Sequence, residues 1–113
     1  MISKYGNRKT EVNGILFDSR REARRWVELT FLQRAGEIRD LQRQVVFELV
    51  PAQKDEKGRC VERAVKYIAD FVYFDVNGNL VVEDAKSPAT RTELYRLKKK
   101  LMRYFKGIEI VEV

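Results

Sequence analysis

The chain has 113 residues, 44% of them hydrophobic, so one compact domain with a substantial core is expected. Its net charge of +6 favours a polyanionic partner, most commonly nucleic acid. The sequence contains no histidine, which excludes histidine-ligated zinc, HNH-type nucleases and histidine-dependent catalytic triads. Any catalysis must therefore use carboxylates, lysine, arginine or tyrosine, and a hard, oxygen-binding metal is the expected cofactor.

The sequence predicts a cytoplasmic protein. No stretch is long and apolar enough to cross a membrane, so no membrane partner is expected. The polar, basic beginning lacks the apolar region of a secretory signal. Cys60 is the single cysteine, so no disulfide can form within the chain, as is usual in a reducing compartment.

The first third of the chain predicts a basic arm followed by a helix. Residues 1–10 are expected to be a flexible arm, and GILF at 14–17 to be a short extended segment. The helix begins at Asp18-Ser19, where Ser19 and Glu22 have the spacing of a capping box. Gly36 is expected to end it.

Three strands, a second helix and a last strand follow. The strands are predicted at 44–50, 63–75 and 80–86; Pro51 ends the first, residues 52–59 form a charged connection, and VNGN at 76–79 joins the other two. Thr90 and Glu93 repeat the capping-box spacing before the second helix. The spacing of four apolar positions predicts the face that this helix buries: Leu94, Leu97, Leu101 and Tyr104 or Phe105. IEIVEV at 108–113 alternates as the last strand, so the order is helix, three strands, helix, strand, in an α/β (α+β) chain with a mixed sheet flanked by helices.

Three charged residues occupy the second and third strands. A three-residue loop at 76–78, or a five-residue loop at 75–79, puts Asp70 opposite Asp84, and a loop at 77–79 puts it opposite Lys86. Either register places all three on one face, whereas a two-residue Asn77-Gly78 loop puts Asp70 on the other face. The turn chemistry permits both outcomes.

Both faces of this hairpin are apolar and are expected to be covered, so carboxylates there need a compensating positive charge. Lys86 supplies one charge, and a divalent cation would supply more. A plain ion pair of Asp70 or Asp84 with Lys86 at a strand end is the alternative. Glu83 alternates to the opposite face from Asp84 and is interpreted as a surface or ion-pair residue. If the register shifts, Glu83 would replace Asp84 as the ligand.

At these residues the chain resembles the PD-(D/E)XK nuclease superfamily, which implies a restriction-endonuclease-like core. The motif of that superfamily corresponds to Asp70 on one strand and Asp84-Ala85-Lys86 on the next, and Glu22 corresponds to a glutamate that many members carry on the first helix. Ala69 stands where the motif often has proline.

A narrower resemblance covers nearly the whole chain. A family of small phage proteins linked to Holliday junction resolvase-like nucleases is similar in the stretches KYGNRKTEVNGILFDSRREARRW, LQRAGEIRDLQ and VVEDAK. The resemblance implies an Mg²⁺- or Mn²⁺-dependent endonuclease for branched DNA, acting in phage recombination or replication. It also implies metal binding by Asp70, Asp84, Glu22 and the Ala85 carbonyl, with Lys86 assisting catalysis. Two symmetric cuts in a four-way junction favour a homodimer.

Other roles remain open at this stage. Glu22 is either a ligand or only the capping partner of Ser19, Trp26 is interpreted as a core residue, and Gln44 as a substrate contact or an edge hydrogen bond. Basic residues of the two helices are expected to grip DNA phosphates: Arg20, Arg21, Arg24, Arg91, Arg96, Lys98, Lys99 and Lys100. The alternatives to a resolvase-like enzyme are a non-catalytic nucleic-acid-binding module, a nuclease of the same fold acting on flaps, ends or nicked duplexes, and a subunit of a larger phage machine.

Overall fold

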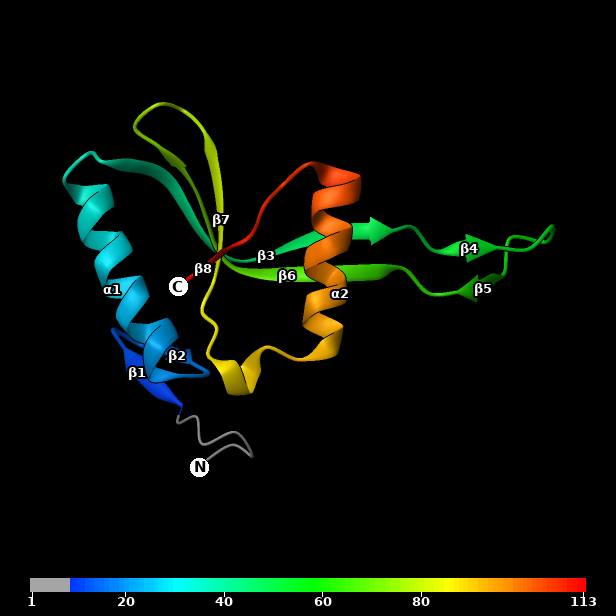
Figure 1. Cartoon of the computed structure of the whole chain (residues 1–113), viewed down its shortest axis with the longest axis horizontal. Helices are drawn as coiled ribbons and strands as arrows, with labels where there is room; N and C mark the ends of the chain where they lie inside the picture. Colours follow the sequence, from blue (N-terminus) through cyan, green and yellow to red (C-terminus); the bar gives the residue numbers. More distant parts are fainter. Residues whose placement is uncertain (1–8) are drawn as a thin grey trace.

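The computed structural model describes residues 9–113, which form an α/β fold with a mixed four-stranded sheet and two α-helices (Figure 1). The predicted class is therefore confirmed. The sheet has the strand order β3-β6-β7-β8. The elements follow one another along the chain as α1 (Arg20–Arg34), β3 (Ile38–Val50), β6 (Val65–Asp75), β7 (Leu80–Asp84), α2 (Glu93–Leu101) and β8 (Val111–Glu112). No helix among the described residues is long and apolar enough to span a bilayer.

Local capping sets the ends of both helices. Ser19 accepts a hydrogen bond from the backbone of Glu22, and Gly36 adopts a φ of +78° just beyond α1, as expected for the two ends of that helix. For α2, the predicted cap at Thr90 is wrong. Thr90 belongs to the 3₁₀ turn η1 (Pro88–Thr90), and Thr92 caps α2 by accepting from the Tyr95 N–H.

The β6–β7 hairpin has a three-residue loop at 76–78. The Asp75 N–H donates to the Asn79 carbonyl at 2.9 Å, and Gly78 takes the positive φ, +81°, that the turn requires. The pairing of Phe71 with Glu83 makes Asp70 and Asp84 the next opposed positions. Of the registers that the sequence allowed, the one with facing carboxylates is thus confirmed.

The two helices cover opposite faces of the sheet. Phe71 and Val72, successive residues of β6, point to different faces, and each packs into the core next to a different helix. The α1-side core consists of Phe17, Ala23, Leu29, Ile38, Phe71 and Tyr73, with Trp26 packed against it as expected. The α2-side core consists of Leu49, Tyr67, Ala69, Val72, Val82, Tyr95, Met102 and Ile110.

The alternation of side chains is interrupted in the middle of the sheet. Arg43 stacks on an aromatic ring of the α1-side core, yet Val45, two residues on, packs against the α2-side core. Between them Gln44 has a φ of +52°, a left-handed conformation that reverses the alternation along β3. Across the ladder, Ala69 and Phe71 change sides in the same way, and the site described below lies at this switch.

Two hairpins lie outside this sheet. Strands β1 (Thr10–Val12) and β2 (Ile15–Phe17) pair ahead of α1, so the expected arm ends before Thr10; residues 1–8 of that prediction lie outside the described residues. Strands β4 (Gln53–Lys54) and β5 (Cys60–Glu62) form a ribbon that projects from β3 and β6 (Figure 1), where only a charged connection was expected.

The boundaries of several strands also differ from the prediction. The first strand of the sheet begins six residues earlier than expected, at Ile38, because β3 pairs with the whole length of β6. Pro51 follows its end, as predicted. The last strand is shorter than expected, although the Val113 N–H still donates to the Asp84 carbonyl at 3.0 Å.

The buried face of α2 differs from the predicted one except at Leu101, which is half-buried against the α2-side core. Tyr95 and Met102 are buried, whereas Leu94 and Leu97 are more than half exposed. The helix continues as the π-helical turn η2 (Met102–Lys106). The error arises because a stripe of leucines and a stripe containing Tyr95 and Met102 have the same helical period, and only the position of the sheet decides between them.

Candidate active site

Two carboxylates of neighbouring strands meet at the end of the β6–β7 ladder. Asp70 accepts a hydrogen bond from the Ala85 backbone N–H at 2.8 Å, so its side chain reaches across to the strand that carries Asp84. The two carboxyl groups are close enough to interact, and Asp84 raises the pKa of Asp70. Asp70 and Asp84 therefore share one site instead of projecting from opposite faces.

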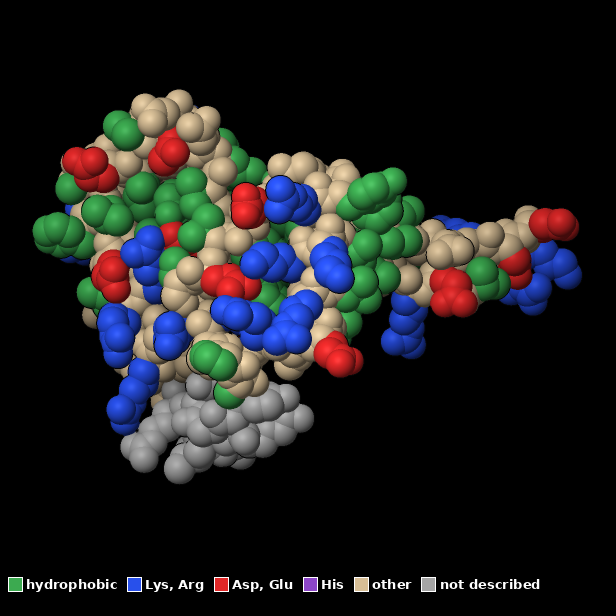
Figure 2. Space-filling view, viewed as in Figure 1, with side chains coloured by type: hydrophobic (Ala, Val, Ile, Leu, Met, Phe, Trp, Pro, Cys, Tyr) green, Lys and Arg blue, Asp and Glu red, His purple; other side chains and the backbone are tan. Residues whose placement is uncertain are grey.

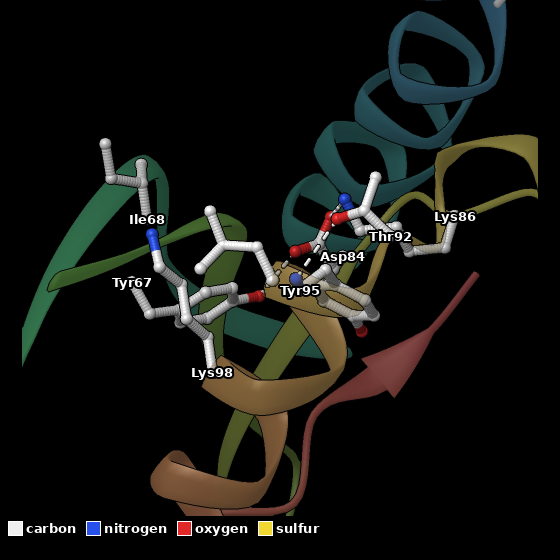
Figure 3. Close-up of a pocket in the computed structure, with 8 residues that line it drawn as sticks. Tyr67, Ile68, Asp84, Lys86, Thr92, Tyr95 and Lys98 are labelled. Carbon is white, nitrogen blue, oxygen red and sulfur yellow. Dashed lines mark hydrogen bonds and ion pairs between the residues drawn. The ribbon is translucent and has the colours of Figure 1, made fainter. Parts of the chain in front are cut away.

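Lys86 completes the pair with a positive charge. Its Nζ lies 3.2 Å from Oδ1 of Asp84 and 4.4 Å from the centroid of the Tyr95 ring. Tyr67 donates its hydroxyl to Oδ2 of Asp84 at 2.6 Å. Figure 3 shows Tyr67, Asp84 and Tyr95 converging in a pocket that Thr92 and Lys98 also line. The ion pair proposed as the alternative reading exists, and it lies inside the carboxylate site.

Glu22 reaches the same site from the first turn of α1. Its backbone N–H is the group capped by Ser19, which leaves the side chain to point inward, where it is buried. Gln44 donates to Oε1 of Glu22 at 3.3 Å. Glu22 interacts electrostatically with both Asp84 and Asp70. The capping position and membership of the site are therefore compatible, and Gln44 orients a site carboxylate.

Asp70 and Glu22 are both shifted toward the protonated state. Burial, followed by Asp84 and then Glu22, raises the pKa of Asp70 to about 8, although the Ala85 N–H opposes the shift. Burial also raises the pKa of Glu22, with Asp18 and Asp84 adding to the effect and Arg43 opposing it. At neutral pH the metal-free site therefore keeps a proton on Asp70.

The pKa of Asp70 predicts how stability changes with pH in the metal-free protein. Folded Asp70 keeps its proton up to pH about 8, whereas unfolded Asp70 loses it near 3.8, so the folded state binds the extra proton between these values. The contribution of Asp70 to stability is therefore complete below pH 3.8. The free energy of unfolding should fall as pH rises from there toward 8, by up to about 1.4 kcal/mol per pH unit. Urea unfolding in EDTA at pH 5, 6, 7 and 8 measures this slope.

Asp70→Asn is the matched variant for this measurement, because asparagine keeps the acceptor for the Ala85 N–H and cannot ionise. Its unfolding free energy should vary less with pH than that of the unmodified protein. No histidine titrates in this window, since the chain has none. Equal slopes for the two proteins would assign the pH dependence to other groups.

The donor set suits a hard divalent cation. Glu22, Asp70 and Asp84 offer only oxygen atoms, which Mg²⁺ and Mn²⁺ prefer, and a bound cation would offset the charge that raises the pKa of Asp70. Among residues 9–113, no three acidic or cysteine side chains are already arranged to hold an ion. Ala85 contributes its N–H in this structure, and a role for its carbonyl stays a prediction.

Arg43 is a site residue that the sequence analysis missed. Its guanidinium lies 4.6 Å from the centroid of the Phe17 ring and 5.8 Å from that of Trp26, and it lowers the pKa of Glu22. Its Nε is buried without a hydrogen-bond partner among the described residues. The alternation of β3 gives no sign of this placement, since the left-handed Gln44 reverses it.

A buried ion pair lies on the opposite face of β7. Arg25 binds Glu83 through two hydrogen bonds, Nε to Oε1 at 2.8 Å and Nη2 to Oε2 at 2.7 Å, and the Tyr73 hydroxyl also donates to Glu83. Glu83 and Asp84 therefore point to different faces of β7, as predicted. Glu83 is an ion-pair residue, but it is buried and not a surface group. Because Arg25 is one turn after Glu22 on α1, this pair fixes the helix that supplies Glu22 to the strand that supplies Asp84.

The basic residues expected to contact DNA fall into two groups. Arg91 and Lys99 are paired with Glu112, at 2.7 and 3.0 Å. The others are not in an ion pair with any residue of the described chain: Arg20, Arg21, Arg24, Arg96, Lys98 and Lys100. Lys and Arg side chains gather over α2, beside the candidate site (Figure 2). Their role in binding stays a prediction.

Comparison with known proteins places the chain in a family. Residues 2–111 match the family described as "Protein of unknown function (DUF1064)". The chain belongs to the DUF1064 family. No curated protein and no solved structure matches it significantly. Membership of the DUF1064 family therefore leaves the chemistry of the site to be argued from its residues.

Proposed function

We propose that the protein is a metal-dependent DNA endonuclease of the PD-(D/E)XK type, a hydrolase of phosphodiester bonds. The observation that carries the proposal is the meeting of Asp70 with Asp84-Ala85-Lys86 at the ends of two paired strands, with Glu22 brought in from α1. The order α1, β3, β6, β7, α2, β8 is the order expected of a restriction-endonuclease-like core.

Each residue has a defined part in this proposal. Asp70, Asp84 and Glu22 would hold Mg²⁺ or Mn²⁺, which, when bound, polarises the scissile phosphate and acidifies water. Lys86, held between Asp84 and the Tyr95 ring, would stabilise negative charge developing on the phosphate. Tyr67 orients Asp84 through its hydroxyl. Arg43 places a second positive charge beside Glu22.

The proposed substrate is branched DNA, including four-way junctions, met during phage recombination or replication in the bacterial cytoplasm. The cations of α2 suit phosphates, which carry no sequence information, and this favours recognition by DNA structure over sequence. A twofold homodimer would supply the two symmetric cuts that resolution requires. The alternative, which needs one cut by one active site, is cleavage of flaps, ends or nicked duplexes by the same fold.

A labelled panel of four-way, flapped, nicked and linear DNA tests the proposal. The unmodified protein should cleave branched substrates with Mg²⁺ or Mn²⁺ and not in EDTA, and paired symmetric nicks in the four-way substrate would distinguish resolution from flap or end cutting. A protein that binds this DNA but cuts none of it with either metal would refute the enzyme proposal. The binding-module reading would then stand.

That second reading has an observation of its own. Asp84 already has partners in Lys86 and Tyr67, and Asp70 has one in the Ala85 N–H, so the group is internally satisfied without an ion. A structural polar cluster in a basic DNA-binding module would look the same. Cleavage, not binding, separates the two functions.

A further inference from the structure

An exposed face of α2 and η2 combines apolar, aromatic and cationic side chains. Tyr104 is 81% exposed and Phe105 53% exposed, although both lie within three residues of the buried Met102. The face also contains Leu94 and Leu97, at 59% and 51% exposure. A helix of this length normally buries its large apolar residues, so this face is suited to a ligand.

We propose that this face binds single-stranded nucleic acid, with unpaired bases stacked on Tyr104 and Phe105 and phosphates on the neighbouring cations. The proposal rests on the proposed function only for the choice of DNA as the partner. It adds a binding site separate from the carboxylates and a substrate feature, an unpaired strand, that the candidate active site alone does not specify.

The two aromatic rings offer surfaces for stacking. Tyr104 and Phe105 are 5.0 Å apart between ring centroids and meet edge to face at 86°, which holds each ring while leaving ring surface open to solvent. They belong to the π-helical turn η2. Such turns are rare in proteins, and those that occur are often at functional sites. Bases of any sequence stack on such rings, because every base has a π face.

The charge of this segment selects a polyanion over a second copy of the chain. Between residues 93 and 106 there are six cations and one acid: Arg96, Lys98, Lys99, Lys100, Arg103, Lys106 and Glu93. Only Lys99 of these cations is paired with an acidic side chain of the described chain. A twofold contact through this face would set like charges against one another, whereas phosphates would neutralise them.

The face leads away from the candidate active site. Leu94 and Lys98 line the same pocket as Asp84 and Lys86. Figure 3 shows Lys98, Asp84 and Lys86 around this pocket. At about 1.5 Å per residue, the ten steps from Leu94 to Tyr104 extend roughly 15 Å along the helix. A strand with a phosphate in the pocket can therefore continue along α2 to the aromatic pair.

Fluorescence anisotropy with the whole chain in EDTA tests the inference without cleavage. The probes are a labelled 20-nucleotide oligo-dT and a labelled 20-base-pair duplex. Tyr104→Ala and Phe105→Ala should each raise the single-strand Kd by about 5- to 150-fold, the loss expected for one stacked base, and change the duplex Kd by less than about twofold. Tyr104→Trp should retain affinity and show quenched emission when the oligonucleotide binds.

Two controls make the result specific. Lys100→Ala should weaken the binding of both probes and reduce the salt dependence of each Kd, since it removes a phosphate contact. Val76→Ala, at a 73% exposed position on the distant β6–β7 turn, should change neither. Circular dichroism checks that each variant is folded.

Several outcomes would overturn the inference. These are no single-strand binding by the unmodified protein, equal losses for both probes in the alanine variants, or a dimer in size-exclusion chromatography that Tyr104→Ala converts to a monomer, which would make the face a protein interface. Metal-dependent cleavage that persists under any of these results leaves the proposed function intact. If the unmodified protein neither binds the two probes nor cleaves branched DNA, both the inference and the proposed function are refuted.

Discussion

Asp84→Asn is expected to lower the rate of Mg²⁺-dependent DNA cleavage by about 10³-fold or more. Asparagine keeps an oxygen that can accept from Tyr67, but it removes the negative charge that would hold a cation beside Asp70. A cation contributes several kcal/mol to stabilising a phosphoryl transition state, and each 1.36 kcal/mol is a tenfold rate change. Single-turnover cleavage of labelled branched DNA measures the rate, and anisotropy in EDTA should show unchanged binding.

Lys86→Ala should have a similar effect on cleavage, since it removes the only cation paired with Asp84 in the described chain. Asp40→Asn is the matched control, because Asp40 is an exposed acid with a φ of +56°, a conformation that asparagine tolerates. This control should cleave normally. Undiminished cleavage by Asp84→Asn would place the chemistry elsewhere in the molecule.

Arg25→Ala is expected to lower the free energy of unfolding by about 3–5 kcal/mol. The change leaves Glu83, which is 1% exposed, with Tyr73 as its remaining partner, and an unpaired buried charge is among the most destabilising defects in proteins. Because Arg25 ties α1 to β7, the same variant should also weaken the site that depends on Glu22. Urea unfolding measures the first effect, and cleavage at a temperature where the variant remains folded measures the second.

The controls for this pair use the same arginine. Glu28→Gln removes the exposed Arg25–Glu28 ion pair, 3.2 Å long, and should cost less than about 1 kcal/mol. The double variant Arg25→Met with Glu83→Met should recover much of the lost stability, because apolar residues of similar volume can replace a buried ion pair. A loss for Arg25→Ala no larger than for Glu28→Gln would show that Glu83 does not depend on this partner.

Much of the site was predictable because hairpins obey simple geometry. Once Asp70 and Asp84 are in paired strands, only the loop length decides whether they face one another, and the sequence left two outcomes. The position of Glu22 was predictable as a helix start. Its burial beside the strands was not, since capping patterns do not tell where a helix packs.

Other features depended on contacts between distant parts of the chain. The left-handed Gln44 begins the stretch QVVFELV, which reads as an ordinary strand, yet it moves Arg43 to the α1 side and so beside Glu22. The partner of Glu83 is 58 residues away, on α1. Strand periodicity reports which residues share a face, but not which helix covers that face.

The sequence by itself determined the α/β class, the approximate helices and strands, and the acidic character of one strand end, because these follow from local periodicity, capping and turn residues. The tertiary structure alone decided which face of α2 is buried, how Tyr95 and Lys86 come to lie against Asp84, and which aromatic residues remain in solvent. The physical reason is that a helix with two apolar stripes can pack on either. The sheet buried the stripe containing Tyr95 and Met102, and this choice left Tyr104 exposed.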